Sequence, residues 1–207
     1  MKQLNGVWLP DHEEHLYRFA VNGPPGEWTY QKSKLDAAVR FCKKRDVAID
    51  IGGHCGLWAR ELCKLFGHVH SFEPVPDHRD CYRLNQRTRN FTLYPCALGE
   101  QNGRAGFQTN PGSSGDTWLT EGASVEIKTL DFFDLAPDFI KIDCEGYELF
   151  VLRGGRQTIL KHRPVVIVEQ KPGNSRKYGL GDTDAVKWLI KQGYKLQAEI
   201  VGDYILT

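Results

Sequence analysis

The sequence has no long apolar run and no excess of charge of either sign. Its longest cluster of branched aliphatic residues, Val165–Val168, is far shorter than the roughly 20 residues of a membrane-spanning helix. Residues 1–6 carry no apolar core of signal-peptide length, so we expect a cytoplasmic protein. With 27 basic and 26 acidic residues the net charge is +1, and no overall field requires nucleic acid or anionic lipid as a partner.

Closely spaced cysteines are also missing. None of the six cysteines lies two to four residues from another, which removes the paired spacing of a structural zinc site. A disulfide framework is not expected in a chain of this size without a secretion signal. We therefore expect reduced thiols at Cys42, Cys55, Cys63, Cys81, Cys96 and Cys144.

The length of 207 residues suits one domain with a sizeable core. Residues 1–33 have no sustained hydrophobic period and contain Trp8, Trp28 and the turn at 22–26. We expect this segment to be an N-terminal extension or lid that packs on a main domain covering residues 34–207.

Strand and helix patterns alternate from Val47 onward, which predicts an α/β fold with a mainly parallel sheet covered on both faces. Gly99–Gly115 is rich in Gly, Asn and Ser, and we expect loops there with one short strand near 105–108. The expected strands are 47–51, 68–73, 91–96, 124–128, 139–143, 165–169, 195–201 and 204–206, the last two forming a hairpin across Gly202-Asp203. The expected helices are 34–45, 57–66, 76–87, 147–160 and one capped by Asp182 that ends near Lys191.

The strand Val47–Ile51 contains Asp50 and leads into a glycine turn, Gly52-Gly53-His54-Cys55-Gly56. Such a turn after a strand is suited to a nucleoside-bearing cofactor. A dinucleotide places its pyrophosphate over this turn, where the Asp50 carboxylate would repel it. The ammonium group of a methionine tail would be attracted instead, so we expect S-adenosylmethionine.

A second cofactor signal is Glu73, in Phe72-Glu73-Pro74. It lies 73 − 50 = 23 residues after Asp50, close to the offset of about 20 at which an acidic residue binds ribose hydroxyls. Two acids at the ends of successive strands, with a glycine turn, are more specific than either acid alone.

Several motifs together resemble the FkbM-type methyltransferases. They are Asp50 to Gly56, Phe72-Glu73-Pro74, Cys96-Ala97-Leu98-Gly99, Thr129-Leu130-Asp131, Ile140 to Glu148, and His162-Arg163-Pro164 leading into Val166 to Glu169. The most specific of them is the Asp-x-Glu-Gly sequence at Asp143. One departure is His54, where many relatives carry Asn; the histidine could donate to the cofactor or only support the turn.

The resemblance implies a Rossmann-like, class I methyltransferase with a seven-stranded sheet, three layers and a C-terminal antiparallel hairpin. It implies methyl transfer from S-adenosylmethionine to a hydroxyl oxygen, with a carbohydrate or other small polar molecule as acceptor. Asp50 would face the methionine moiety, Glu73 the ribose and the Cys96-Ala97 turn the adenine. The cofactor-binding residues expected on this basis are Asp50, Gly52, Gly53, His54, Gly56, Glu73, Pro74, Cys96, Ala97 and Asp143.

The catalytic candidates are Asp143, Glu145, Glu169 and Lys171. Asp143 and Glu169 end two strands that should be neighbours, about 4.8 Å apart, beside the crevice where ligands bind in such sheets. Like charges this close need a proton, a cation or a basic partner, which indicates function. The alternative is that the carboxylates cap the helices that follow.

Acid–base energetics limits the mechanism. A carboxylate has a pKa of about 4 and an unactivated hydroxyl resembles water at about 15.7, so prior deprotonation would cost roughly 16 kcal/mol. Asp143 should therefore take the proton while the methyl group moves, an effect of about 100- to 10,000-fold. In the alternative mechanism, a divalent cation bound by Asp143 and Glu169 acidifies the hydroxyl first.

Three other functions stay open at this stage. Lys34, Asp143, Lys171 and Glu199 could form the Lys-Asp-Lys-Glu tetrad of RNA ribose 2′-O-methyltransferases. The chain could also bind the cofactor without transferring a methyl group. An NAD-dependent dehydrogenase is least expected, because the turn lacks the required glycine spacing.

Overall fold

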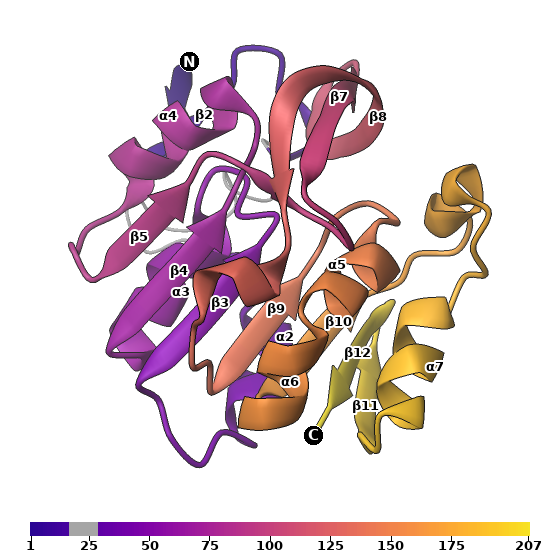
Figure 1. The fold of residues 1–207 in the computed structure, drawn as a ribbon. Helices are drawn as coiled ribbons and strands as arrows, with labels where there is room; N and C mark the ends of the chain where they lie inside the picture. The colour runs from indigo at the N-terminus through magenta and orange to yellow at the C-terminus, as the bar shows by residue number, and fades with distance from the viewer. Residues whose placement is uncertain (17–28) are drawn as a thin grey trace.

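A seven-stranded, mainly parallel sheet forms the centre of the molecule (Figure 1). The computed structural model describes residues 1–16 and 29–207. The strand order is β11-β12-β10-β9-β3-β4-β5; β12 runs antiparallel to both β10 and β11, and the pairs from β10 to β5 are all parallel. This confirms the predicted fold class. The strands are β3 (Val47–Ile51), β4 (His68–Phe72), β5 (Phe91–Tyr94), β9 (Phe139–Ile142), β10 (Val165–Glu169), β11 (Leu196–Ile200) and β12 (Asp203–Leu206).

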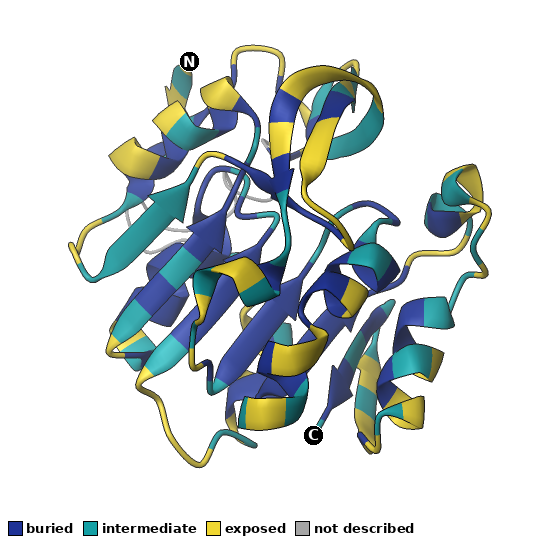
Figure 2. Cartoon of the chain, in the orientation of Figure 1, coloured by how far each residue is buried: buried dark blue, intermediate teal, exposed yellow. Residues whose placement is uncertain are grey.

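The central strands are buried on both faces, as their unbroken apolar composition predicts. Every residue of β9 and β10 is buried (Figure 2). One face is covered by α2 (Lys32–Val39), α3 (Leu57–Leu65) and α4 (Pro76–Asn85), and the other by α5 (Glu148–Gly154), α6 (Arg156–His162) and α7 (Asp184–Lys191). The result is three layers with an apolar core on each side of the sheet.

Three helix predictions need correction. The helix expected over 34–45 is α2, which begins at Lys32 and ends at Val39. The helix expected over 147–160 is two helices, because the chain breaks at Gly154-Gly155, where α5 passes against the backbone of Gly99. Asp182 does not cap α7, whose N-cap is Thr183. The Asp182 carboxylate instead accepts a hydrogen bond from the Gly173 backbone and pairs with Arg176.

The expected loops at Gly99–Gly115 are largely a long β-hairpin, which we call the arm. It consists of β7 (Gly103–Asn110) and β8 (Ser113–Lys128), with β6 (Ala97–Leu98) paired to the base of β8. A register shift between Ala105 and Gly106 bends the arm, and Gly122 sits there with a φ of +144°. Figure 1 shows the arm rising beyond the carboxyl ends of the parallel strands.

The described part of the N-terminal segment packs on α4. It forms a small hairpin of β1 (Lys2–Leu4) and β2 (Val7–Leu9). Trp8 exchanges two backbone hydrogen bonds with the Asn85 side chain, at 2.8 and 2.9 Å. Trp28 and the turn at 22–26 lie outside the described residues, and the lid role stays a prediction. Within the described ranges, no helix is long and apolar enough to cross a bilayer.

The close approach of α5 to Gly99 gives a stability prediction. A Cβ at residue 154 would lie 1.9 Å from the Gly99 carbonyl oxygen, whereas a Cβ at Gly103 would meet open space. We expect Gly154→Ala to lower the free energy of unfolding by about 2 to 3 kcal/mol, and Gly103→Ala to change it by less than about 0.5 kcal/mol. Urea denaturation of both variants measures this, and equal midpoints would contradict the close packing.

Candidate active site

The glycine turn after β3 is folded against the ends of the neighbouring strands. Gly52 and Gly53 both donate a backbone hydrogen bond to the Phe72 carbonyl oxygen, at 3.1 Å each. Gly52 has a φ of +78°, and a Cβ there would lie 1.9 Å from the Asp143 carbonyl oxygen. Gly56, with a φ of +76°, is packed against the Tyr82 ring and begins α3. The sequence therefore needs glycine at both positions.

Asp50 does not point where the sequence analysis placed it. Side chains alternate along a strand, and Asp50 lies on the same side of β3 as Ala48, toward α3, where it is fully buried. Its nearest charged partner is Lys141, with Nζ 3.6 Å from Oδ1, and burial raises the pKa of Asp50 to about 6. Asp50 is not among the residues that line the cavity, and its role toward the methionine moiety stays a prediction.

Glu73, at the end of β4, holds the turn in place. Its Oε2 accepts a hydrogen bond from the His54 backbone at 2.8 Å, and its Oε1 accepts one from Val75 at 2.8 Å. The His78 ring lies 3.3 Å from Oε1. A carboxylate has about four lone-pair positions, so acceptor capacity remains for a ligand hydroxyl.

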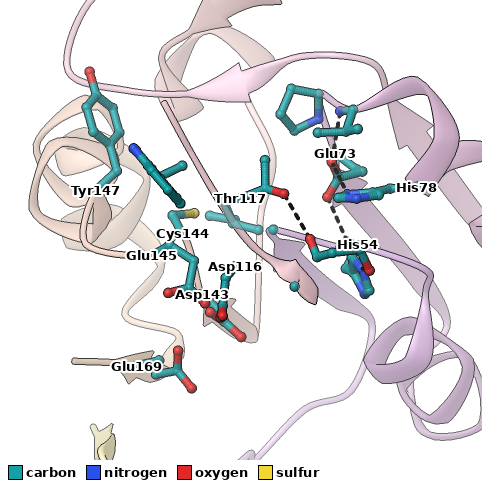
Figure 3. A pocket seen from close by; sticks show the side chains of 18 of the residues that line it. His54, Glu73, His78, Asp116, Thr117, Asp143, Cys144, Glu145, Tyr147 and Glu169 are labelled. Carbon is teal, nitrogen blue, oxygen red and sulfur yellow. Dashed lines mark hydrogen bonds and ion pairs between the residues drawn. The ribbon is translucent and has the colours of Figure 1, made fainter. Parts of the chain in front are cut away.

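A cavity of about 1150 Å³, including its open mouth, lies between the glycine turn, the arm and the ends of β9 and β10. Figure 3 shows Glu73, His54 and His78 on one side and Asp143, Glu145 and Glu169 on the other. The predicted residues in its wall are Gly52, Gly53, His54, Glu73, Pro74, Ala97, Asp143, Glu145, Glu169 and Lys171. Gly56 and Cys96 are not in the wall; Cys96 is buried in the core beneath it.

The acidic residues converge because the strands are in register. Val168 pairs with Ile142, so the next residues, Glu169 and Asp143, leave adjacent strands side by side. Asp143, Glu145 and Glu169 each present a carboxylate oxygen within 4.8 Å of the others. The predicted cluster is thus brought together at one edge of the sheet.

Two lysines balance this charge. Lys141 is buried, with its Nζ 3.6 Å from Asp50 and 3.4 Å from Asp143. The Lys171 Nζ lies 2.8 Å from Glu169 and 3.4 Å from Glu145. The sequence analysis missed Lys141, although a lysine inside the apolar strand Phe139–Ile142 was a visible signal.

The carboxyl groups differ in their affinity for protons. Burial acts to raise the pKa of Asp143, but the charges of Lys141 and Lys171 outweigh it and lower the pKa overall. Burial and the neighbouring Asp143 raise the pKa of Glu169 to about 9. The same two causes raise the pKa of Glu145 to about 7. Of the three carboxyl groups, Asp143 therefore holds a proton least tightly and Glu169 most tightly.

The tetrad of RNA ribose methyltransferases is not assembled. Lys34 forms an ion pair with Asp203, on β12, and lies outside the cavity wall. Glu199 is exposed on β11. Asp143 and Lys171 are the two tetrad members that line the cavity.

Comparison with known proteins identifies the family of this chain. The family model described as the methyltransferase FkbM domain matches residues 50–196. The hexuronic acid methyltransferase AglP of Haloferax volcanii is 33% identical over 139 residues, which cover 62% of this chain and 57% of that protein.

Solved structures support the fold. The methyltransferase FkbM from Methylobacillus flagellatus KT superposes with a TM-score of 0.54 at 22% identity, over 86% of this chain and 46% of that one. A Streptococcus mutans protein described as a methyltransferase, solved in complex with S-adenosylhomocysteine, superposes with a TM-score of 0.51 at 13% identity, over 84% of this chain and 94% of that one. With the family match over 50–196, the chain belongs to the FkbM methyltransferase domain family.

Proposed function

We propose that this protein transfers a methyl group from S-adenosylmethionine to a hydroxyl oxygen of a carbohydrate or other small polar acceptor. The observation that carries the proposal is a cavity in which a glycine turn and Glu73 face Asp143, whose pKa two lysines lower. The S-adenosylhomocysteine bound to a structural neighbour and the hexuronic acid named for the relative AglP support the cofactor and the acceptor class.

The residues of the turn fit this cofactor. Gly52 and Gly53 line the cavity without side chains of their own, so their backbone is open to close approach by a ligand, and Glu73 keeps acceptor capacity for ribose hydroxyls. The cofactor supplies a methyl group on a sulfonium. We assign the ribose to Glu73 and Pro74, and the adenine to the wall near Ala97, while Asp50 acts indirectly by fixing Lys141.

We assign the proton to Asp143. As the acceptor oxygen gains the methyl group, its O–H bond breaks and the proton passes to an Asp143 carboxylate oxygen. The charge of Lys141 favours the ionised form of Asp143, and Glu169, whose pKa is raised, lies beside it. Lys171 already occupies the space between Glu145 and Glu169, where its ammonium group would repel a divalent cation. This favours base catalysis over metal activation.

Cofactor binding is the first test. Isothermal titration calorimetry should detect S-adenosylhomocysteine binding and no binding of NAD at the same concentration, because the turn lacks dinucleotide glycine spacing. Gly52→Ala should weaken this binding, since its Cβ would push the turn away from Asp143. NAD binding without S-adenosylhomocysteine binding would refute the proposal.

Replacing the base is the second test. We expect Asp143→Asn to lower kcat about 100- to 10,000-fold while the Kd of S-adenosylhomocysteine changes little. Asp36→Asn is the matched control, because it removes an exposed carboxylate that is paired with Lys32. Full activity in Asp143→Asn would exclude both base catalysis by Asp143 and activation by a metal bound to Asp143. Activity that survives chelation supports the base, and loss restored by Mg²⁺ would assign the carboxylates to a metal.

The third test uses pH. Because Lys141 and Lys171 lower the pKa of Asp143, the native enzyme should show no Asp143-dependent loss of kcat/KM between pH 5 and 8. Lys171→Met removes one cation, so the pKa of Asp143 rises and activity should fall as pH decreases toward 5. The rate profile from pH 5 to 9 measures this. If the low-pH half of the profile were the same in Lys171→Met as in the native enzyme, Lys171 would not act on Asp143.

A further inference from the structure

A buried carboxyl group, Glu13, connects three segments that are distant in sequence. The side chains of Glu13 and Ser114 are both fully buried, 101 residues apart. One Glu13 oxygen accepts a hydrogen bond from the Leu16 backbone at 2.6 Å. The other accepts from the Ser114 backbone at 2.7 Å and from the Ser114 hydroxyl.

The connection continues into the glycine turn. The His54 Nε2 lies 2.7 Å from the Ser114 hydroxyl oxygen. The single hydroxyl proton of Ser114 is donated to Glu13, so the proton between His54 and Ser114 must come from His54 Nε2. Burial lowers the pKa of His54, which keeps the ring neutral and gives one tautomer, protonated at Nε2.

Further contacts fix both ends of this chain of hydrogen bonds. The Gly112 carbonyl, at the tip of the arm, accepts hydrogen bonds from Glu14 and His15 at 2.9 and 3.2 Å. At the other end, Asn85 binds the backbone of Trp8 and the Cys55 carbonyl, which ties the N-terminal segment to the glycine turn. The arm tip is thus held over the turn by the N-terminal segment.

We propose that Glu13, Ser114 and His54 form a clamp that holds the arm and the N-terminal segment over the cofactor side of the cavity. The inference rests on the proposed function, because it takes the cavity to bind S-adenosylmethionine. His54 also donates its backbone N–H to Glu73, so the clamp positions the residue assigned to the ribose. These three are positioning residues for the cofactor, and Asp143 remains the group that receives the proton.

The clamp predicts a change in cofactor binding without a change in the chemical step. Ser114→Ala removes the link between Glu13 and His54. The dissociation rate and Kd of S-adenosylhomocysteine should rise about tenfold, the ratio expected for one hydrogen bond to a carboxyl group. KM for S-adenosylmethionine should rise similarly, with kcat at saturation unchanged. A merely structural defect would lower the active fraction and leave KM unaltered.

Two comparisons sharpen the test. Thr109→Val removes a hydroxyl from the same arm, where Thr109 contacts Thr117, and should change cofactor affinity less than twofold. Glu13→Gln should weaken binding like Ser114→Ala, and the double variant should be no weaker than either single one if they act as a unit. If Ser114→Ala matched Thr109→Val, the clamp would be refuted.

A readout without cofactor separates the clamp from the proposed function. The ¹⁵N chemical shifts of the His54 ring should indicate the Nε2-protonated tautomer in the wild type and a mixture in Ser114→Ala. Hydrogen exchange at the Glu14, His15 and Leu16 amides should be faster in the variant. If the wild type bound no S-adenosylhomocysteine but these changes occurred, the clamp would stand and the proposed function would fail. Unchanged shifts and exchange would overturn the clamp.

Discussion

The arrangement of this site depends on how a buried positive charge balances acids at the carboxyl edge of a parallel sheet. Lys141 lies between Asp50 and Asp143, and Lys171 lies between Glu145 and Glu169. Parallel strands in register bring the carboxylates together even though their like charges repel one another. The lysines make that convergence stable and give the acids different proton affinities. As a consequence, the pKa of Asp143 is lowered while those of its neighbours Glu145 and Glu169 are raised.

The two halves of the cavity are built from different kinds of structure. The half that contains Asp143 and Glu169 follows directly from β9 and β10, which are wholly buried. The cofactor half is assembled from the glycine turn, the arm and the N-terminal segment, which meet through Glu13 and Ser114. Its geometry depends on a few buried hydrogen bonds, which are costly to break because both partners are shielded from water.

Local sequence patterns predicted the sheet well and long-range contacts poorly. The strands at Val47–Ile51 and Val165–Glu169 agree with the structure because continuous apolar runs define them. Asp50 was misplaced because one step along a strand reverses the direction of a side chain. The arm was taken for loops because its exposed strands carry few alternating apolar residues. No local signal could pair Glu13 with Ser114.

The arm has its own small apolar cluster, formed by Ala97, Ala105, Val125 and Ile127, apart from the two cores that flank the sheet. Residues Asp116–Leu119 therefore border the cavity without supporting the sheet. Random mutations there can alter which molecules fit while the fold remains stable. If the proposed function holds, such a division allows selection to explore new acceptors in descendants of this gene while Asp143 and its lysine partners stay unchanged.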